Sequence, residues 1–358
     1  SKDDRVNEWW QNIMPTQGEP SYDDKILHRE KNYAKGGPNP ETEDRVMLVR
    51  NRVSRIYYSK HFFDYPVSLK WDTIRNMGFA TTMKAGFSYL HSVFKKLPED
   101  NLENFYINRF GRVLYSMFFE GYTEKLWGRH PREISADWGS QRVKGLSITA
   151  VIKDVFSKIL PKKKNAKVET SLIEEYIYPK YGPGQLWEAV ADDIKKMGGK
   201  IVMNTEVKDI NTKDGKILSI TCIENGVPVE YEGDIFMSSM PVNDLVAGIK
   251  GSEIPDIVKE SAADLPFRDF VTVGLLLNKL NLKKLKTLNN IVPDCWIYVQ
   301  DTGVKLGRIQ IFNNWSPYMV EDPEKYVWIG LEYFCREGDN FWNMSDEECI
   351  NMAIAELE

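Results

Sequence analysis

Short runs of β-prone residues, separated by polar joints, mark the first part of the chain. The β-prone runs 46–50 and 53–58 are joined at Asn51 and Arg52, and a third run at 61–69 follows them. Runs of this kind, separated by short polar joints, predict a hairpin or a short meander.

From residue 71 to residue 163 the apolar residues recur at helical spacing. Asp100 and Glu103 form a D-x-x-E start signal for a helix. Apolar residues then recur at helical intervals, at Leu102, Phe105, Phe110, Leu114, Met117, Phe118 and Trp127. We therefore predict a helical domain, which ends at Pro161 in a charged stretch (162–165) that we interpret as a solvated loop or linker.

The sequence between residues 181 and 238 predicts one helix and several short strands. The helix opens in the loop YGPGQL (181–186), continues to Met197 and ends at Gly198-Gly199, before a strand at 200–203. Short strands are expected at 207–210, 217–223 and 229–231, around the hairpin turns Asp214-Gly215 and Asn225-Gly226, with a buried strand at 235–238.

Strands dominate again after residue 270. They are predicted at 271–277, 295–299, 308–312 and 326–333. A final helix starts at Ser345, which forms a capping box with Glu348. At roughly 150 residues per domain, the 358 residues and this mixture of elements predict an α/β protein of two or three domains.

Composition narrows the class of ligand. The 47 Lys and Arg against 52 Asp and Glu give a net charge of −5, which argues against nucleic acid because phosphate binding needs a surplus of cations. A hydrophobic content of 42% is enough to form cores. We therefore expect a small-molecule substrate.

Membrane, metal and export signals are weak. The longest clean apolar stretch, 270–277, is too short to span a bilayer. Four cysteines without CxxC spacing and four histidines without ligand spacing predict neither a disulfide framework nor a metal site. The opening residues 1–14 do not resemble a secretory signal, so a cytoplasmic protein is expected.

General phosphate-binding and catalytic motifs do not assign the chain. The sequence contains neither G-x-G-x-x-G nor G-x-x-x-x-G-K-[ST], and the loop YGPGQL is as consistent with a tight turn entering a helix as with a phosphate site.

One segment is more specific. Residues 111–136, GRVLYSMFFEGYTEKLWGRHPREISA, resemble the signature LYxxFFxGYTxKxWGxxPxEL of the UDP-galactopyranose mutases, which are flavoenzymes. The matching positions are Leu114, Tyr115, Phe118, Phe119, Gly121, Tyr122, Thr123, Lys125, Trp127, Gly128, Pro131 and Glu133. Downstream, Arg308-Ile309 and Ser316-Pro317 reproduce an RI-x6-SP spacing of those mutases, and Glu332-Tyr333 stands for their EY pair.

Two further stretches, YPKYGPGQL (178–186) and 234–241, resemble the flavin domain of the wider group of amine oxidases and protoporphyrinogen oxidases. The resemblance implies an incomplete FAD-binding Rossmann-like domain, an inserted helical domain and an antiparallel β-sheet substrate domain. The domain ranges it implies are 1–45 (FAD-binding), 46–70 (β-hairpin), 71–165 (helical), 166–245 (FAD-binding with a small β insertion) and 246–358 (β-sheet and the start of a helix).

The resemblance also implies site residues. Tyr122 and Trp127 would flank a uracil, Arg308 and Tyr333 would contact a diphosphate, and Arg142 would be the mobile-loop arginine, although strict counting falls on Gln141. Lys180 and Gly184 would lie beside the flavin, and Val207 would meet the adenine. From the residues alone, the three aromatic side chains could equally be core residues, and Arg308 a surface ion pair.

The function that the resemblance implies is an FAD-dependent interconversion of pyranose and furanose in a UDP-sugar by reduced flavin. One alternative is an oxidoreductase of the amine oxidase or protoporphyrinogen oxidase type, and another is a nucleotide-sugar-binding protein without catalysis. Because such proteins hold FAD with a glycine-rich turn that is absent here, the resemblance implies a chain truncated at both ends, which by itself binds FAD weakly or not at all and is inactive as an enzyme.

Overall fold

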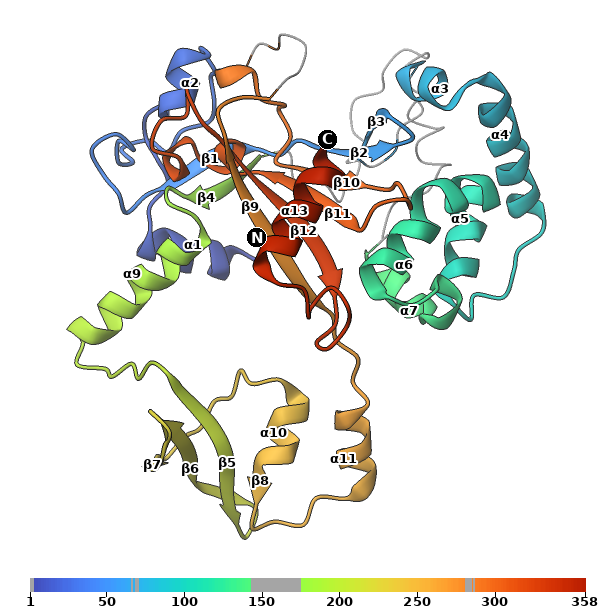
Figure 1. The fold of residues 1–358 in the computed structure, drawn as a ribbon. Coiled ribbons are helices and arrows are strands. Elements are labelled where there is room, and N and C mark those ends of the chain that lie inside the picture. Colours follow the sequence, from blue (N-terminus) through green and yellow to red (C-terminus); the bar gives the residue numbers. More distant parts are fainter. Residues whose placement is uncertain (1–2, 66, 68–70, 143–174, 281–284, 286) are drawn as a thin grey trace. The chain divides into compact units, whose positions relative to one another are not determined.

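The computed structural model describes residues 3–65, 67, 71–142, 175–280, 285 and 287–358 (Figure 1). The chain divides into two units, a larger one of Ser1–Ala189 with Arg268–Glu358 and a smaller one of Val190–Phe267. Helices, antiparallel sheets and two parallel strand pairs occur together, which confirms the predicted α/β class.

The larger unit contains a six-stranded sheet in the order β3-β2-β10-β11-β12-β9. Its strands are β2 (Ser54–Tyr58), β3 (His61–Asp64), β9 (Asp269–Leu277), β10 (Trp296–Val299), β11 (Leu306–Ile311) and β12 (Val327–Cys335). All neighbours are antiparallel except β2 and β10. The four strands predicted after residue 270 are therefore confirmed.

One face of this sheet forms the main core. Ile297, Ile311, Leu331 and Tyr333 are buried there, and helix α13 (Asp346–Leu357) contributes Ala353. The predicted capping box of α13 is present, because Ser345 accepts from the Glu348 backbone and Glu348 accepts from that of Ser345. Since side chains alternate along a strand, the residues between these core positions lie on the opposite face.

The predicted hairpin is present in the runs 53–58 and 61–69, but the run 46–50 is not part of it. Strand β1 (Met47–Asn51) pairs instead with β4 (Glu175–Pro179), in a separate two-stranded sheet. The hairpin is formed by β2 and β3, through Ser59 and Lys60, which both have positive φ (49° and 63°). Two successive positive φ angles match the right-handed twist of a two-residue hairpin, and the sequence signal for them is weak because neither residue is glycine.

The helical part of the larger unit confirms the predicted helical region as far as Arg142, and the rest of it, with the predicted linker at 162–165, lies outside the described residues. Its elements are α3 (Trp71–Met77), α4 (Phe79–Phe94), α5 (Leu102–Tyr115), the π-helix η1 (Ser116–Glu120), α6 (Gly121–Trp127), the 3-10 helix η2 (Pro131–Glu133) and α7 (Ala136–Arg142). The cap of α5 is Asn101, whose side chain accepts from Asn104 N at 2.9 Å, and not Asp100.

A kink in α5 sets the direction of the helices that follow it. Gly111 has φ 79° inside α5, and a Cβ there would lie 2.7 Å from the backbone nitrogen of Tyr89 on α4. Only glycine allows both this angle and this close approach. The π-helix η1 comes directly after the kinked helix and leads into α6.

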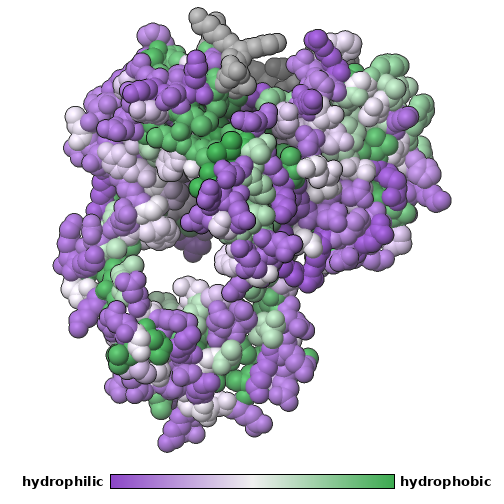
Figure 2. All heavy atoms as spheres, viewed as in Figure 1, coloured by the Kyte–Doolittle hydropathy of each residue, from purple (hydrophilic) through white to green (hydrophobic). Residues whose placement is uncertain are grey.

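Helix α4 keeps an apolar stripe on its outer side. Phe79, Phe87 and Phe94 are 77%, 66% and 86% exposed. Figure 2 shows the hydrophobic side chains as a pale green area over α3 and α4. Among the described residues, no helix is long and apolar enough to cross a bilayer.

The smaller unit is a four-stranded sheet with two helices, and α9 (Pro183–Lys196) leads into it from the larger unit. Its elements are β5 (Thr205–Lys213), β6 (Lys216–Glu224), β7 (Val227–Glu232), α10 (Val242–Gly248), β8 (Ile249–Lys250) and α11 (Asp256–Ala263). Both predicted turns are confirmed, since Asp214, Gly215, Asn225 and Gly226 all have positive φ.

The predicted strands at 200–203 and 235–238 are wrong. Both segments lack regular structure, and Met203 and Met237 are 74% and 94% exposed. Their apolar composition suits a strand, but a strand needs a neighbour for its backbone N–H and C=O groups. No strand pairs with either segment within the described residues.

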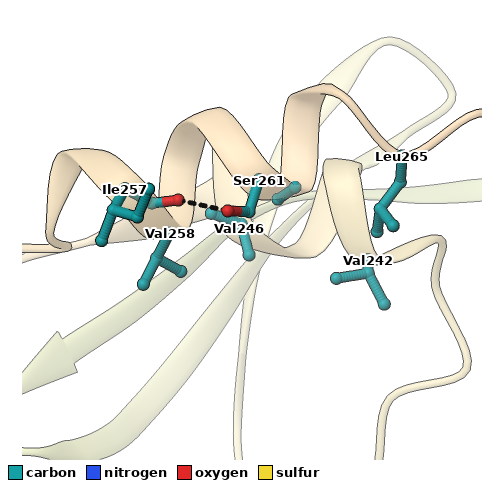
Figure 3. A pocket seen from close by; sticks show the side chains of 7 residues that line it. Val242, Val246, Ile257, Val258, Ser261 and Leu265 are labelled. Carbon is teal, nitrogen blue, oxygen red and sulfur yellow. Dashed lines mark hydrogen bonds between the residues drawn. The ribbon is translucent and has the colours of Figure 1, made fainter.

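Helices α10 and α11 line a cavity of about 330 Å³ in the smaller unit (Figure 3). The side chains around it are apolar, apart from Ser261, whose hydroxyl donates to the Ile257 carbonyl of its own helix at 2.6 Å. With no polar group left to orient a substrate, this cavity lacks the convergent polar side chains of a ligand site.

A buried ion network braces β1 in the larger unit. Arg50 is 2% exposed and donates to both carboxylate oxygens of Asp23, at 3.0 and 2.9 Å, and to the carbonyl of Asn314 at 3.2 Å. Lys31 and Asp24 form a second pair at 2.8 Å. Burial raises the pKa of Asp23, but the charge and hydrogen bonds of Arg50 outweigh burial and lower that pKa to about 2.

This shift predicts a loss of stability in acid. The contribution of the Asp23 carboxylate is complete above its unfolded pKa of 3.8, and about 2 kcal/mol of it is lost as the pH falls towards 2. In urea titrations, Asp23→Asn should be less stable at pH 6 and should lose less stability than wild type between pH 6 and pH 3. Asp72→Asn, at an exposed position, serves as the control. Equal losses in wild type and Asp23→Asn would contradict this account.

Candidate functional site

A charged cluster lies at the centre of the second face of the six-stranded sheet. The register pairs Tyr298 with Arg308 and Arg308 with Glu332, so all three side chains share this face, which we call the Arg308 face. Arg308 Nε donates to one carboxylate oxygen of Glu332, and the amide of Gln310 donates to the other.

The geometry leaves Arg308 prepared for a ligand. Glu332 is buried at 3% exposure, whereas the Arg308 side chain is 31% exposed. The Nε bond fixes the plane of the guanidinium and leaves its two terminal amino groups without a hydrogen bond to the described part of the chain. An arginine held in this way presents a fixed pair of donors, which is the geometry that binds phosphate or carboxylate.

Aromatic rings surround this cluster on the side of α6. The Tyr122 ring lies 5.7 Å from that of Tyr298 and 6.5 Å from that of Phe334, nearly perpendicular to both, and Tyr65 lies 4.6 Å from Tyr298. Burial raises the pKa of Tyr122, and the charge of Arg308 opposes only part of this rise. The hydroxyl therefore stays protonated and can donate to an acceptor.

Lys125 fastens α6 to the sheet. Its ammonium donates to the carbonyls of Val299, Asp301 and Leu306 at 3.2, 2.8 and 2.9 Å, which bracket the connection between β10 and β11. Burial lowers the pKa of Lys125 to about 8. Because Lys125 and Tyr122 are three residues apart, they share one side of the helix, and the anchor sets the position of the Tyr122 ring.

Arg268 forms a second anchor at the end of the same helix. It donates to the carbonyls of Leu126 on α6 and Phe334 on β12, both at 3.3 Å. Gly128 ends α6 in the left-handed conformation (φ 63°), and a Cβ there would lie 3.0 Å from the Arg268 guanidinium carbon. Sequence reasoning missed both anchors. The signal for Lys125 was its fixed place in the motif.

A second aromatic group lies on the other side of the cluster. Trp296 stacks on Trp315 of helix α12 (Phe312–Trp315) with 4.9 Å between ring centroids. Trp315 in turn lies 5.4 Å from Tyr176 and 5.2 Å from Tyr178, both on β4. These residues were not predicted from sequence, since they come from three distant segments.

The structure does not bring every predicted substrate residue to Arg308. Trp127 packs edge-on against Trp138 of α7 at 5.2 Å. Tyr333 is 1% exposed in the main core and stacks on Phe341, on the face opposite Glu332. Arg142 is the last residue of α7, and its side chain is outside the described atoms.

The predicted cofactor residues lie in two places. Lys180 bonds to Asp44 at 2.7 Å, and its carbonyl accepts from the Ser316 hydroxyl at 2.6 Å, which joins the YPKYG and SP motifs. Gly184 is exposed in the first turn of α9, and no atom lies within 4 Å of the Cβ it would carry. Val207 belongs to the smaller unit, on β5 opposite Cys222.

No group of three or more His, Cys, Asp or Glu among the described residues is arranged to hold a metal ion. The Arg308 face carries hydrogen-bond donors and aromatic rings around one buried carboxylate. Such a set can bind an anion and a flat ring together.

Comparison with solved structures establishes the fold. The chain is similar to reduced UDP-galactopyranose mutase (TM-score 0.67, 18% identity, 86% of this chain and 62% of that one). It is also similar to a protein described as a protoporphyrinogen oxidase from Exiguobacterium sp. 255-15 (0.57, 13%, 87% and 65%) and to a variant of putrescine oxidase (0.50, 10%, 87% and 64%).

The chain thus spans less than two thirds of the length of the proteins it matches. No family model matches its sequence. At identities of 10–18% the likeness defines the fold, which is the one that UDP-galactopyranose mutase and these oxidases share.

Proposed function

We propose that this chain is part of an FAD-dependent enzyme that acts on a nucleotide sugar and interconverts its pyranose and furanose forms, the activity that the resemblance to the UDP-galactopyranose mutases implies. The proposal rests on Arg308, which is held on the sheet by a buried carboxylate and lies close enough to Tyr122 for its charge to act on the pKa of that hydroxyl. The neighbour's fold supports it. A second support is that Tyr122, from the segment that resembles the mutases, contacts Tyr298, which pairs with Arg308.

In this proposal Arg308 binds the diphosphate. Its terminal amino groups would bond the phosphate oxygens, while Glu332 holds Nε. The Glu332 carboxylate reduces the net positive charge at Arg308. The Gln310 amide also donates to this carboxylate and so offsets part of its negative charge. Glu332 already accepts from two partners, which makes it a brace for Arg308 rather than a general base.

The aromatic residues would hold the base. Tyr122 and Tyr298 offer ring faces and hydroxyl groups near Arg308, and Tyr65 packs its ring against Tyr298. A base–aromatic stack contributes about 1–3 kcal/mol and tolerates any base, so hydrogen bonds must select uracil. For Trp127, which packs on Trp138, a role at the base remains a proposal from the motif alone.

The residues around the proposed cofactor position fit FAD in part. Gly184 leaves the first turn of α9 open, and several buried N–H donors near Trp296 lack a partner. Lys180 is committed to Asp44, so we assign it the positioning of the 178–186 loop, with Gly184 as a contact to the cofactor. The adenine contact of Val207, in the smaller unit, rests on the resemblance alone. A bound flavin supplies a hydride acceptor when oxidised and a nucleophilic nitrogen when reduced.

The chain's own contribution would be positioning and charge complementarity. When the bond between the sugar and the diphosphate breaks, negative charge grows on the phosphate oxygens. Arg308 and the protonated Tyr122 hydroxyl are fixed before this happens, and preorganised donors lower the barrier without reorganisation.

Turnover under two redox conditions tests the proposal. With the whole flavin-loaded enzyme and dithionite present, we expect conversion of UDP-galactofuranose to UDP-galactopyranose, measured by chromatography, and no conversion when the flavin stays oxidised. Hydrogen peroxide production from an amine in air, without conversion, would support the oxidase alternative. UDP binding without turnover in either state would support the binding-protein alternative.

A further inference from the structure

Helix α4 exposes its large apolar side chains and buries its small ones. The exposed side chains are Phe79, Met83, Phe87, Leu90 and Phe94. Their spacing of three or four residues places them on one side of the helix, and we call this set the α4 stripe. The side chains that α4 buries are those of Ala85 and Ser92. A surface helix ordinarily buries its large apolar side chains, so α4 shows the reverse arrangement.

Contact with α5 fixes α4 in this orientation. A Cβ at Gly111 of α5 would lie 2.7 Å from the backbone nitrogen of Tyr89 on α4. The Ser88 hydroxyl accepts from the backbone N–H of Val113 on α5 at 3.2 Å. Ser88 lies nine residues from Phe79 and therefore on the opposite side of the helix. Because the two backbones are this close, no phenylalanine fits between them, and the α4 stripe must face outward.

The charge around the stripe is opposite in sign to that of the whole chain. Residues 73–98 contain Arg75, Lys84, Lys95 and Lys96 and no Asp or Glu, whereas the chain has a net charge of −5. All four basic residues are exposed. At 100° per residue, Lys84 and Lys95 lie along one border of the α4 stripe. Helix α4 therefore combines an apolar face with a basic border.

A groove between α4 and α5 adds to the positive charge. Its volume is about 400 Å³, and its lining includes Lys95 and Ser92 of α4 and Arg112 of α5. Arg112 lies 3.6 Å from a carboxylate oxygen of Glu103, which also accepts from Arg132 at 3.1 Å. One carboxylate thus faces two guanidinium groups, and the balance of charge beside the groove is positive. Such a groove suits a phosphate group.

The charges decide between two surfaces that would cover the α4 stripe. A second copy of this chain would bring the same basic borders together across a two-fold axis, and like charges repel. The surface of an anionic membrane attracts each basic residue and accepts aromatic side chains at the level of its head groups. We propose that α4 lies in such a surface, with the α4 stripe against the acyl chains and Lys84 and Lys95 at the lipid phosphates.

This contact is with the surface of one leaflet, and it needs no membrane-spanning helix. Its residues do not belong to the Arg308 face, so the inference does not depend on the proposed function. Loss of UDP binding would leave it unchanged, and loss of membrane binding would leave the nucleotide-sugar function unchanged.

Vesicle flotation of the purified full chain tests the proposal. One set of vesicles contains phosphatidylcholine alone, and the other contains equal parts of phosphatidylcholine and phosphatidylglycerol. We expect the protein to bind the anionic vesicles, to bind the neutral ones at least tenfold more weakly, and to be released as salt is added.

Two double variants separate the contributions of charge and apolar surface. Lys84→Gln with Lys95→Gln should weaken binding to anionic vesicles about 25-fold, at about fivefold for each charge. Phe87→Gln with Phe94→Gln should weaken it at least tenfold, because two exposed rings no longer enter the lipid. Glutamine favours helix, so α4 itself should be retained, and circular dichroism checks this.

Each double variant has a matched control. Ile350→Gln with Ile354→Gln removes two apolar side chains that are 43% and 41% exposed on α13. Lys213→Gln with Lys216→Gln removes two exposed charges beside a turn of the smaller unit. Both controls should bind anionic vesicles as wild type does.

Three results would overturn the proposal. They are no binding of wild type to anionic vesicles, equal binding to both kinds of vesicle, and wild-type binding by the α4 variants. Sedimentation velocity examines the alternative partner. A dimer that dissociates in Phe87→Gln with Phe94→Gln, without vesicle binding by wild type, would assign the α4 stripe to a second copy of the chain and overturn the membrane contact.

Discussion

Arg308→Ala should bind UDP about tenfold to a hundredfold more weakly than wild type in titration calorimetry. The reason is the loss of charge-assisted hydrogen bonds, which contribute about 1.5–3 kcal/mol. Arg308→Lys keeps the charge but loses the fork, so it should recover only part of the affinity. The binding should weaken with added salt in wild type and less so in Arg308→Ala.

Arg129→Ala is the control for this series. Arg129 follows α6 in the same motif, is exposed, and has the same charge. It should bind UDP as wild type does. Urea titrations must accompany the measurement, because Arg308→Ala leaves the buried Glu332 with Gln310 as its remaining partner. Wild-type UDP affinity in a folded Arg308→Ala would show that Arg308 does not contact the diphosphate.

Lys125→Met should lower the free energy of unfolding by about 3 kcal/mol and also weaken UDP binding. The substitution keeps the length of the side chain but leaves the carbonyls of Val299, Asp301 and Leu306 without their donor. With its anchor lost, α6 no longer holds the Tyr122 ring against Tyr298. Urea denaturation measures the first effect and calorimetry the second.

Lys84→Met makes the same chemical change at an exposed position of α4. It should alter the free energy of unfolding by less than about 0.5 kcal/mol. If Lys125→Met and Lys84→Met behave alike in both measurements, Lys125 is not an anchor, and the position of Tyr122 needs another explanation.

The regular elements were predictable where a local pattern determines them. Strands β9 and β10 of the six-stranded sheet alternate in burial, and the turns at Asp214-Gly215 and Asn225-Gly226 carry their own backbone preference. The failures at 200–203 and 235–238 have a common cause. Apolar residues indicate that a segment seeks burial, but they do not supply the neighbouring strand.

Pairing across long distances in the sequence was not predictable. Strand β1 is closer in sequence to β2 than to β4, yet it pairs with β4, more than 120 residues away. Nothing in the residues 46–58 selects between those partners, because both pairings satisfy the same backbone groups.

The candidate site was predictable only in part. Two motifs indicated Tyr122 (in 111–136) and Arg308 (in RI-x6-SP), and the structure places these residues near each other. Glu332 and Tyr333 are adjacent on one strand, so they face opposite sides, and the alternation rule already separates the two. The braces at Glu332, Gln310 and Lys125 depend on strand register, which no short motif specifies.

Titration of the purified protein with UDP, in buffer containing FAD, tests the central claim most directly. We expect UDP to bind in the oxidised or the reduced state, with an affinity that falls as salt is added, because the diphosphate must reach the Arg308 guanidinium. ADP should bind more weakly, because adenine cannot form the hydrogen bonds that select uracil. An absence of UDP binding in both redox states would contradict the account and favour an oxidase that does not recognise nucleotide sugars.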